Sequence, residues 1–479
     1  MQQATIGRLS DKILLKIFRN FLGVSPRDWP RLAHVCREWR RIVFASQDVL
    51  HLRLFCTHGT PVLTTLHCWP ILPIIVQFGG VPDFSSPVPR DWGHIVAALK
   101  QPRRVSSISL TVTKSLLQKV STFSEPFSEL EELVLLPQVN LQLSLPLTFQ
   151  WGTRLRKLHT TRIDFPSFLW RLVPSRNLVD IQLYGISDST YMPPELFLTT
   201  LSQMTHLQSL SLHFLSSTNH TSILSPWTVE SVHLPSLTRL NFRGMSEYLT
   251  RLVATLDAPY LEDIKVVFPE YSTSNLSKLS KFINRIEIHK SHRQARILSS
   301  EHAISISLIQ PGASIHFELE LLHKPLDVQL YHMTHIRGWF SDLLFDVEDL
   351  RVSMITTMHP IRGRESYTYS RLWLDLIKSF GGVKWFHVSG NLWGVILQSL
   401  HLPDNQYETV LPALYKLYTP QPGPREEPLR EVVVSVMTSR WLSGHPIAVE
   451  YERQYDVNED RETGAMYDQC QGRYVLTWY

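Results

Sequence analysis

A short apolar pattern recurs through most of the chain and constrains the fold more than any other feature of these 479 residues. One apolar residue is followed by two others, a second apolar residue, one other and a third apolar residue, as at Leu207, Leu210 and Leu212. Full copies begin at Val105, Leu130, Leu178, Leu207, Leu237, Leu261, Ile283, Val347, Val383 and Leu429, and truncated copies lie at Leu155–Leu158 and Leu414–Leu417. Copies in the first part are about 22 to 30 residues apart, a spacing typical of repeats built from one strand and a helix or loop. The pattern predicts stacked strand-and-helix units, and an ordinary α/β domain whose strands begin with this motif is the alternative.

Segments between the copies predict further elements. Apolar residues at helical spacing predict helices at 91–100, 194–201 and 248–256. Alternating apolar residues at 304–308 and 315–321 predict two antiparallel strands, with a turn at Pro311–Gly312 between them. We expect a loop at Arg362–Ser366 and a stiff break at Pro420–Pro428 before a last strand.

In such units the apolar positions of each strand face the core, and the residues between them face outward. The outward set contains residue types enriched at protein interfaces, and its candidate binding residues are Tyr184, His213, Arg239, Arg243, Lys265, Arg351 and Trp385. Arg239 and Arg243 are four apart on one strand face, where either could clamp a phosphate or a carboxylate. Solvated arginines are the simpler interpretation. An extended face of this kind favours a protein partner over a small molecule.

Residues 9–44 predict two short helices with more apolar surface than they can bury against each other. The first helix repeats apolar residues at helical spacing, at Ile13, Leu14, Ile17 and Phe18. After a break at Trp29–Pro30, a second apolar series runs from Leu32 to Val43. A helical pair of about forty residues is too small for a core of its own, so its surplus apolar surface must cover the rest of the chain or a partner.

Two parts of this block together resemble the F-box, the docking motif of substrate receptors in cullin-RING ubiquitin ligases. The first part matches the opening of that motif at Leu9, Asp11, Ile13, Leu14, Ile17 and Phe18. The second part, Val35-Cys36-Arg37 with Trp39, matches its Val-Cys-Arg-x-Trp signature. Ser10 stands where the family usually has proline, and serine suits the N-cap of a helix. Two ordinary helices packed on a larger domain are the alternative.

The resemblance implies a substrate-recognition subunit of an SCF-type ubiquitin ligase that has no catalytic activity of its own. The N-terminal helices would bind a Skp-type adaptor of the cullin ligase, and the repeats would bind a target protein whose identity the sequence leaves open. The expected adaptor-binding residues are Leu9, Ser10, Ile13, Leu14, Ile17, Phe18, Val35, Cys36 and Trp39. A scaffold that binds the adaptor for another purpose, and an enzyme with an unrecognised site, are the alternatives.

The expected fold class is α/β, with a small N-terminal helical F-box followed by an irregular, leucine-rich-repeat-like β/α solenoid. The expected divisions are a docking motif at 1–50, a connecting and capping segment at 51–104, the solenoid at 105–435, and a C-terminal cap with an acidic tail at 436–479.

Composition and motifs argue against several other classes. The net charge of +4 is too small to indicate nucleic-acid binding. Four scattered cysteines form neither a disulfide framework nor a metal motif, and Cys36, on an apolar helical face, is expected to pack rather than react. The sequence shows no signal segment, no membrane-length apolar run and no recognised catalytic or nucleotide-binding motif. We expect an intracellular protein of the cytoplasm or nucleus, with no cofactor, metal or membrane partner.

Overall fold

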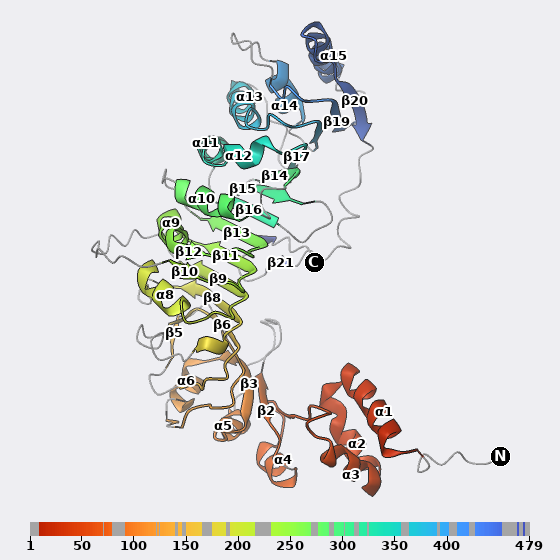
Figure 1. Ribbon diagram of the computed structural model, residues 1–479, viewed down its shortest axis with the longest axis vertical. Helices are drawn as coiled ribbons and strands as arrows, with labels where there is room; N and C mark the ends of the chain where they lie inside the picture. The colour runs from red at the N-terminus through yellow and green to blue at the C-terminus, as the bar shows by residue number, and fades with distance from the viewer. Residues whose placement is uncertain are drawn as a thin grey trace, which may run out of the picture. The chain divides into compact units, whose positions relative to one another are not determined.

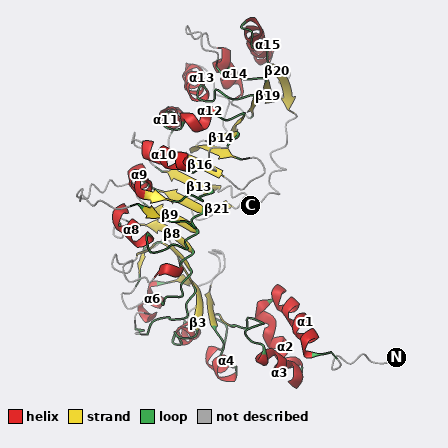
Figure 2. Cartoon of the chain, in the orientation of Figure 1, coloured by secondary structure: helices red, strands yellow, loops and turns green. Residues whose placement is uncertain are grey.

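The computed structural model describes residues 9–69, 71–78, 92–120, 122–123, 125–138, 142–145, 150–164, 175–187, 192–215, 231–269, 276–286, 292–300, 302–310, 316–322, 325–355, 364–389, 393–401, 410–420, 427–452, 467–468 and 473–474. The chain forms two compact units, Met1–Gly244 with Arg251–Leu261 and Met245–Thr250 with Glu262–Tyr479. Figure 1 traces the elements along the chain, and Figure 2 distinguishes helices from strands. The expected turn at Pro311–Gly312 and most of the acidic tail lie outside the described residues.

The first unit begins with three short helices, where the sequence predicts two. Helix α1 spans Asp11–Val24, a 3-10 turn spans Pro26–Asp28, and helices α2 and α3 span Trp29–Val35 and Arg37–Ala45. The expected break at Trp29–Pro30 is instead the start of α2, because proline fits the first turn of a helix, where amide hydrogens have no partner within the helix. The helical conformation is interrupted at Cys36, whose extended backbone (φ −159°, ψ 170°) separates α2 from α3.

The first unit continues as a parallel sheet. Its strands are β1 (Leu54–Cys56), β2 (Ile74–Phe78), β3 (Val105–Val112), β4 (Glu132–Pro137), β6 (Lys157–Thr161), β8 (Asp180–Ile186), β9 (Ser209–Phe214) and β11 (Arg239–Arg243). They pair in the order β1-β2-β3-β4-β6-β8-β9-β11, each parallel to the next. Two short parallel pairs lie outside this sheet: β5 (Leu143–Ser144) with β7 (Ile163–Asp164), and β10 (Val232–His233) with β12 (Leu256–Asp257).

Helices connect the strands of the first unit and cover one side of its sheet. They are α4 (Val62–Cys68), α5 (Gly93–Leu99), α6 (Lys114–Val120) and α8 (Pro194–Leu201). Helix α9 (Ser246–Thr255) is divided between the units, with residues 251–255 in the first. In Figure 1, α6 and α8 lie on the same side of the strands. The strands alternate accordingly: on β8, Ile181 and Leu183 are buried, whereas Asp180 and Gln182 remain partly exposed. The helices expected at 91–100, 194–201 and 248–256 are confirmed to within a few residues.

The second unit contains a mixed sheet. Its strands are β13 (Asp263–Phe268), β14 (Gln294–Ser300), β15 (Ala303–Ile309), β16 (His316–Leu322), β17 (Asp349–Ile355), β18 (Trp385–Val388), β19 (Lys416–Pro420) and β20 (Ala448–Glu452). They run in the order β13-β16-β15-β14-β17-β18-β19-β20. Strand β15 is antiparallel to both β14 and β16, which confirms the expected antiparallel segment, and the other neighbours are parallel.

Helices of the second unit follow its strands. They are α10 (Ser277–Arg285), α11 (Leu326–Arg337), α12 (Ser341–Phe345), α13 (Arg364–Ile377), α14 (Trp393–His401) and α15 (Glu427–Leu442). A two-residue pair, β21 (Tyr467–Asp468) with β22 (Arg473–Tyr474), lies outside the mixed sheet.

One copy of the apolar pattern forms a helix and not a strand. The copy that begins at Leu429 lies within α15, so a helix and not the expected strand comes directly after the break at Pro420–Pro428. Ile283 lies in α10, and the strand expected after it falls on residues 287–291, outside the described residues. An apolar pair three residues apart suits one face of a helix as well as a strand start, and the neighbouring elements decide between the two. The expected loop at Arg362–Ser366 is also wrong in its last three residues, which begin α13.

The remaining expectation for the fold class is confirmed: a helical N-terminal block precedes an α/β region with a long, largely parallel sheet. Strands β1, β2, β14 and β20 carry no copy of the pattern and escaped sequence analysis. Of these, β1 and β2 precede residue 105 and β20 follows residue 435. Strands therefore extend outside the range expected for the solenoid, whose limits stay a prediction.

The outward-facing His159 on β6 provides a test of strand register through pH. Burial, partly offset by Asp180, lowers the pKa of this imidazole below its ordinary value. The folded chain therefore holds His159 neutral, and the stability this contributes is lost as the pH falls below about 6.5, where the unfolded chain takes up the proton. We expect the free energy of unfolding to decline less between pH 7.5 and pH 5 for His159→Gln than for wild type in urea titrations. His206→Gln, at an exposed position outside the strands, is the matched control variant.

Candidate docking surface and strand face

Helix α1 has two apolar faces, and only one of them is covered. Leu14, Phe18 and Leu22 recur every four residues and are buried. A second series is exposed. The solvent-exposed fraction of the residue is 50% for Ile13, 46% for Ile17 and 39% for Phe21. The exposed α1 stripe comprises Ile13, Ile17, Phe21 and Val24 of the helix together with Leu9 just before it. Single exposed apolar residues are ordinary, but a continuous stripe on one helix marks a surface that another molecule covers.

The covered face of α1 packs against α3. The ring of Phe18 lies 4.8 Å from that of Trp39, centroid to centroid, and Ile42 of α3 is fully buried. Leu14 and Phe18, two of the expected adaptor-binding residues, are therefore part of the internal core of the helices. Trp39 is half-buried beside Phe18. It therefore supports α1 and also forms part of the exposed surface of the helices.

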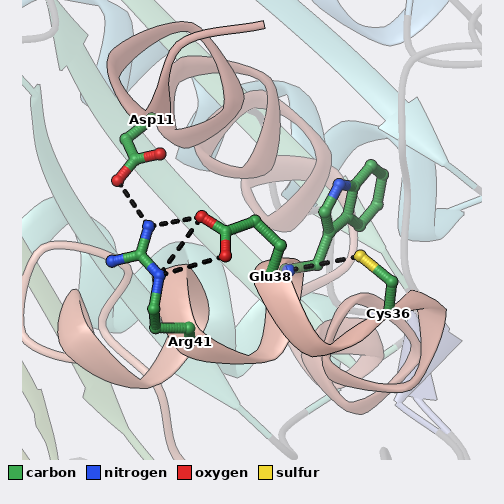
Figure 3. A network of polar contacts seen from close by, with 5 residues as sticks. Asp11, Cys36, Glu38 and Arg41 are labelled. Atoms are coloured by element: carbon green, nitrogen blue, oxygen red, sulfur yellow. Dashed lines mark hydrogen bonds and ion pairs between the residues drawn. The ribbon is translucent and has the colours of Figure 1, made fainter. Parts of the chain in front are cut away.

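The junction between α2 and α3 presents Val35 and Cys36 to solvent. Val35 is 59% exposed. Cys36 is exposed as well, and its Sγ accepts a hydrogen bond from the amide of Trp39 at 3.4 Å, so that it caps the start of α3 (Figure 3). The expectation that Cys36 packs on an apolar helical face is therefore wrong, because the sequence breaks the helix at this residue.

Ser10 occupies the N-cap position of α1 but does not cap it with its hydroxyl. Its carbonyl accepts hydrogen bonds from the amides of Ile13 and Leu14 at 2.9 and 3.0 Å, and its side chain makes no cap bond. The start of α1 is tied to α3 by the ion pair of Asp11 with Arg41, which also pairs with Glu38 of α3. Arg41 Nη2 lies 2.7 Å from Asp11 and 2.5 Å from Glu38 (Figure 3).

The Arg41 guanidinium favours the ionised form of Glu38. Its hydrogen bond to Glu38 lowers the pKa of that carboxyl below its ordinary value, and the two acids raise the pKa of Arg41. All three side chains are largely exposed, so this network orients α1 more than it stabilises the fold.

Aromatic residues attach the three helices to the first strands of the sheet. Trp29 is buried, and its Nε1 donates to the carbonyl of Arg53 at 2.7 Å. The ring of Trp69, just after α4, lies 5.0 Å from Trp29 and 6.1 Å from Phe44. Arg27 stacks over the ring of Phe55 at 5.3 Å. Sequence analysis did not predict these contacts. Trp29, between the two predicted helices, could have indicated packing against another element, because a tryptophan buries a large apolar surface.

The sequence-predicted residues of the first unit's strand face lie next to one another. Tyr184 on β8 is in register with His213 on β9, and His213 is in register with Arg243 on β11. The rings of Tyr184 and His213 are 4.3 Å apart, and that of His159 is 5.2 Å from Tyr184. Burial raises the pKa of the Tyr184 hydroxyl, which therefore stays neutral.

The predicted residues of the second unit are more widely spread. Lys265 on β13 pairs with Glu318 on β16 at 2.9 Å; burial alone would lower its pKa, but this carboxylate and Glu320 raise it. Arg351 on β17 pairs with Asp349 at 3.3 Å. Trp385 on β18 is 38% exposed, so it lies outside the core as its register predicts.

One aromatic contact of the second unit involves residues that are not among the candidate binding residues predicted from the sequence. Tyr418 on β19 stacks on His387 of β18, with ring centroids 4.0 Å apart and planes 3° from parallel. Lys416 lies 4.8 Å from the Tyr418 ring and pairs with Glu450. The signal was present in the truncated copy at Leu414–Leu417, since the outward position after Leu417 is Tyr418.

Within the described residues, no three histidine, cysteine, aspartate or glutamate side chains gather to hold a metal ion. None of the helices in the same part of the chain combines the length and the apolar content needed to cross a membrane.

A model of the F-box-like family matches residues 9–57, which contain α1, α2, α3 and β1. No curated protein matches the chain. The N-terminal region is thus an F-box-like domain. Domains of this family imply binding to a Skp-type adaptor, and the proteins that carry them typically act as adaptors without catalysis.

The cysteines offer a direct test of the helix boundary at Cys36. Burial raises the pKa of the Cys56 thiol to about 11, whereas Cys36 and Cys68 are exposed. Because the thiolate is the reactive form, iodoacetamide at pH 8 should modify Cys36 and Cys68 and spare Cys56 in the native chain. Peptide mass spectrometry measures the three sites separately, and denaturation should make Cys56 equally reactive. A native Cys36 as inert as Cys56 would contradict the break between α2 and α3.

Proposed function

We propose that this protein is a substrate-recognition subunit of an SCF-type ubiquitin ligase. Its F-box-like domain binds a Skp-type adaptor, and its strand faces bind a target protein. The observation that carries the proposal is the exposed α1 stripe inside the F-box-like domain, because these apolar side chains have no partner in the folded domain that would account for them.

The adaptor contacts divide into exposed and supporting residues. Leu9 and Ser10, just before α1, and Ile13 and Ile17 of α1 contact the adaptor directly. Val35 and Cys36 do so as well, since all six residues are exposed. Leu14, Phe18 and Trp39 act indirectly by holding α1 against α3. Phe21 and Val24 extend the same exposed stripe, and we add them to the contact surface.

The target-binding half of the proposal is supported by the strand faces. Their outward positions carry Tyr184, Arg243 and Trp385, residue types that often dominate binding energy at interfaces. Repeats similar to leucine-rich repeats present such positions side by side on successive strands, which suits an extended protein surface. The chain then contributes proximity: it holds target lysines near the ubiquitin-charged enzyme of the ligase and performs no covalent step.

The attachment of the helices to the sheet supports the same function. Trp29 of α2 contacts Trp69, and the side chain of Arg27 donates a hydrogen bond to that of Gln77 on β2. A target held on the first unit would therefore keep a defined distance from the adaptor, as directed transfer of ubiquitin requires.

The exposed α1 stripe can be tested without damage to the core. We expect Ile13→Asp combined with Ile17→Asp to weaken binding to a Skp-type adaptor at least ~100-fold, since two buried apolar contacts of about 1.5 kcal/mol each are lost and two charges are desolvated. Co-purification and calorimetric titration measure the change. Leu196→Asp replaces an equally exposed leucine on α8 and should bind as wild type.

The choice of residues makes this experiment decisive. Leu14 and Phe18 are unsuitable for this test, because a charge at either buried position would unfold the helices. Binding would then be lost through unfolding and not through loss of a contact with the adaptor. Unaltered adaptor binding by the folded double variant, or no binding by wild type, would overturn the proposal.

A second measurement separates a ligase subunit from a scaffold that binds the adaptor for another purpose. Proteins captured by the strand faces should be ubiquitinated only when the adaptor is bound. We therefore expect the Ile13→Asp, Ile17→Asp variant to capture the same proteins from cells as wild type but with their ubiquitin conjugates strongly reduced, as measured by quantitative mass spectrometry. Equal conjugate levels with the two proteins would favour the scaffold.

A further inference from the structure

A row of positively charged side chains runs along helix α1 beside the exposed α1 stripe. Lys12, Lys16 and Arg19 form this basic row, and all three are exposed. Their spacing of four and three residues places them on one face of the helix. Asp11 is the only acidic residue of α1, and it pairs with Arg41 of α3 at 2.7 Å instead of with a member of the row (Figure 3).

The basic row borders the exposed α1 stripe on the side away from the core. A cation, an exposed apolar residue and a buried apolar residue follow one another at Lys12, Ile13 and Leu14, and the same order repeats four residues later. Each step along a helix turns the side chain by about 100° around the axis. The stripe therefore lies between the buried residues and the basic row, so a partner that covers the stripe has the basic row at its edge.

The cations of the basic row are uncompensated, whereas other arginines of the F-box-like domain have acidic partners. Arg31 pairs with Asp28 at 3.3 Å, and Arg53 lies 4.0 Å from Glu131. Within the described residues, no side chain of the basic row forms an ion pair or a hydrogen bond. Their charges are therefore open to an external anion.

The other uncompensated arginine of the domain lies beside the second part of the proposed adaptor contacts. Arg37 directly follows Cys36, is exposed, and has no ion pair or hydrogen bond from its side chain within the described residues. Arg27 and Arg40, by contrast, donate hydrogen bonds to a glutamine side chain of β2 and to a carbonyl of α2. The unpaired lysines and arginines of residues 9–57 thus all adjoin the proposed contact surface.

The excess positive charge of the chain lies in this domain. Residues 9–57 contain nine lysines and arginines against four aspartates and glutamates, whereas the whole chain has 47 against 43. The rest of the chain is therefore close to neutral. A local excess of one sign attracts a partner surface of the opposite sign and repels surfaces of its own sign.

We propose that the basic row binds a cluster of carboxylates on the adaptor, at the edge of the apolar contact. The inference rests on the proposed function, because it names the chemistry of the surface that covers the exposed α1 stripe. Charges at the edge of an interface act mainly on the rate of association, whereas the buried centre limits the rate of dissociation. The basic row therefore guides the encounter with the adaptor, and the apolar stripe holds the complex together.

The neighbouring apolar stripe favours an acidic protein surface over a nucleic acid. A sugar–phosphate backbone would neutralise the basic row but leave Ile13 and Ile17 in water. A protein surface with an apolar centre and carboxylates at its edge covers the stripe and the basic row together, and an apolar centre within a polar rim is the usual anatomy of an interface.

Charge reversal on the full chain tests the effect on association. We expect Lys12→Glu combined with Lys16→Glu and Arg19→Glu to lower the association rate constant with a purified Skp-type adaptor at least tenfold at about 25 mM salt. The dissociation rate constant should change less than threefold. Surface plasmon resonance measures both. The difference from wild type should shrink at about 500 mM salt, because the Debye length then falls to about 4 Å. Glutamate is a good helix former, so α1 is retained in the variant.

Helix α10 supplies a matched control. Lys278→Glu combined with Lys281→Glu and Arg285→Glu makes the same change of net charge at three exposed residues of one helix, which also have no ion pair within the described residues. This control should associate with the adaptor as wild type does. Equal association rates of wild type and the α1 variant, or equal losses in both triple variants, would overturn the role of the basic row.

Carbodiimide crosslinking of the wild-type complex tests for the carboxylates directly. The reagent joins a lysine amine to a carboxylate where the two are in contact. We expect peptide mass spectrometry to find Lys12 or Lys16 joined to an aspartate or glutamate of the adaptor, and Lys278 and Lys281 not joined to it. A complex without such a crosslink, or with Lys12 and Lys16 joined only to carboxylates of this chain, would overturn the adaptor as the partner of the basic row.

The same measurements separate the two proposals. Adaptor binding by wild type that is unchanged in the α1 charge variant refutes the basic row alone. Absence of adaptor binding by every protein, wild type included, refutes the proposed function.

Discussion

The parallel register of the strands is the constraint on which the rest of the structure depends. One buried row crosses the first unit from strand to strand as Cα partners, and its members are Ile108, Leu133, Leu158, Ile181, Leu210 and Leu240. Each is at most 2% exposed. Because side chains alternate with a period of two, a slip of one residue would bring every member of the row to the solvent face, at a cost of about 1.5–3 kcal/mol each. The register of the buried row therefore also determines which polar residues face outward.

The same register determines which residues are neighbours on the outward face of the sheet. Asp180, Ser209 and Arg239 become neighbours because Ile181, Leu210 and Leu240 do. Residues that are 30 positions apart in the chain are thus placed about 4.8 Å from one another, in rows that a partner can contact at once. Which charged residues face outward on the first unit is a consequence of the same alignment.

The N-terminal helices follow the corresponding rule for a period of 3.6. A helix as short as α1 has room for two apolar stripes, and α3 covers only the one that contains Leu14 and Phe18. The other stripe is left for a partner, and the Arg41 network and the aromatic contacts around Trp29 hold the domain that carries it. Core and docking surface are thus opposite sides of one helix, so residues adjacent in sequence, such as Ile17 and Phe18, have different roles.

The sequence by itself determined the F-box-like block, the order of helical and α/β regions, and most strands, because each depends on a local period of apolar residues. It also placed Tyr184, Arg239, Arg243 and Trp385 outside the core, since the strand period alone decides which way they face. Tertiary structure decided that the copy at Leu429 became a helix and not a strand, since a spacing of three fits both. It also decided which stripe of α1 was covered and which side chains of neighbouring strands met. Those outcomes depend on contacts between segments far apart in the chain, which no local period encodes.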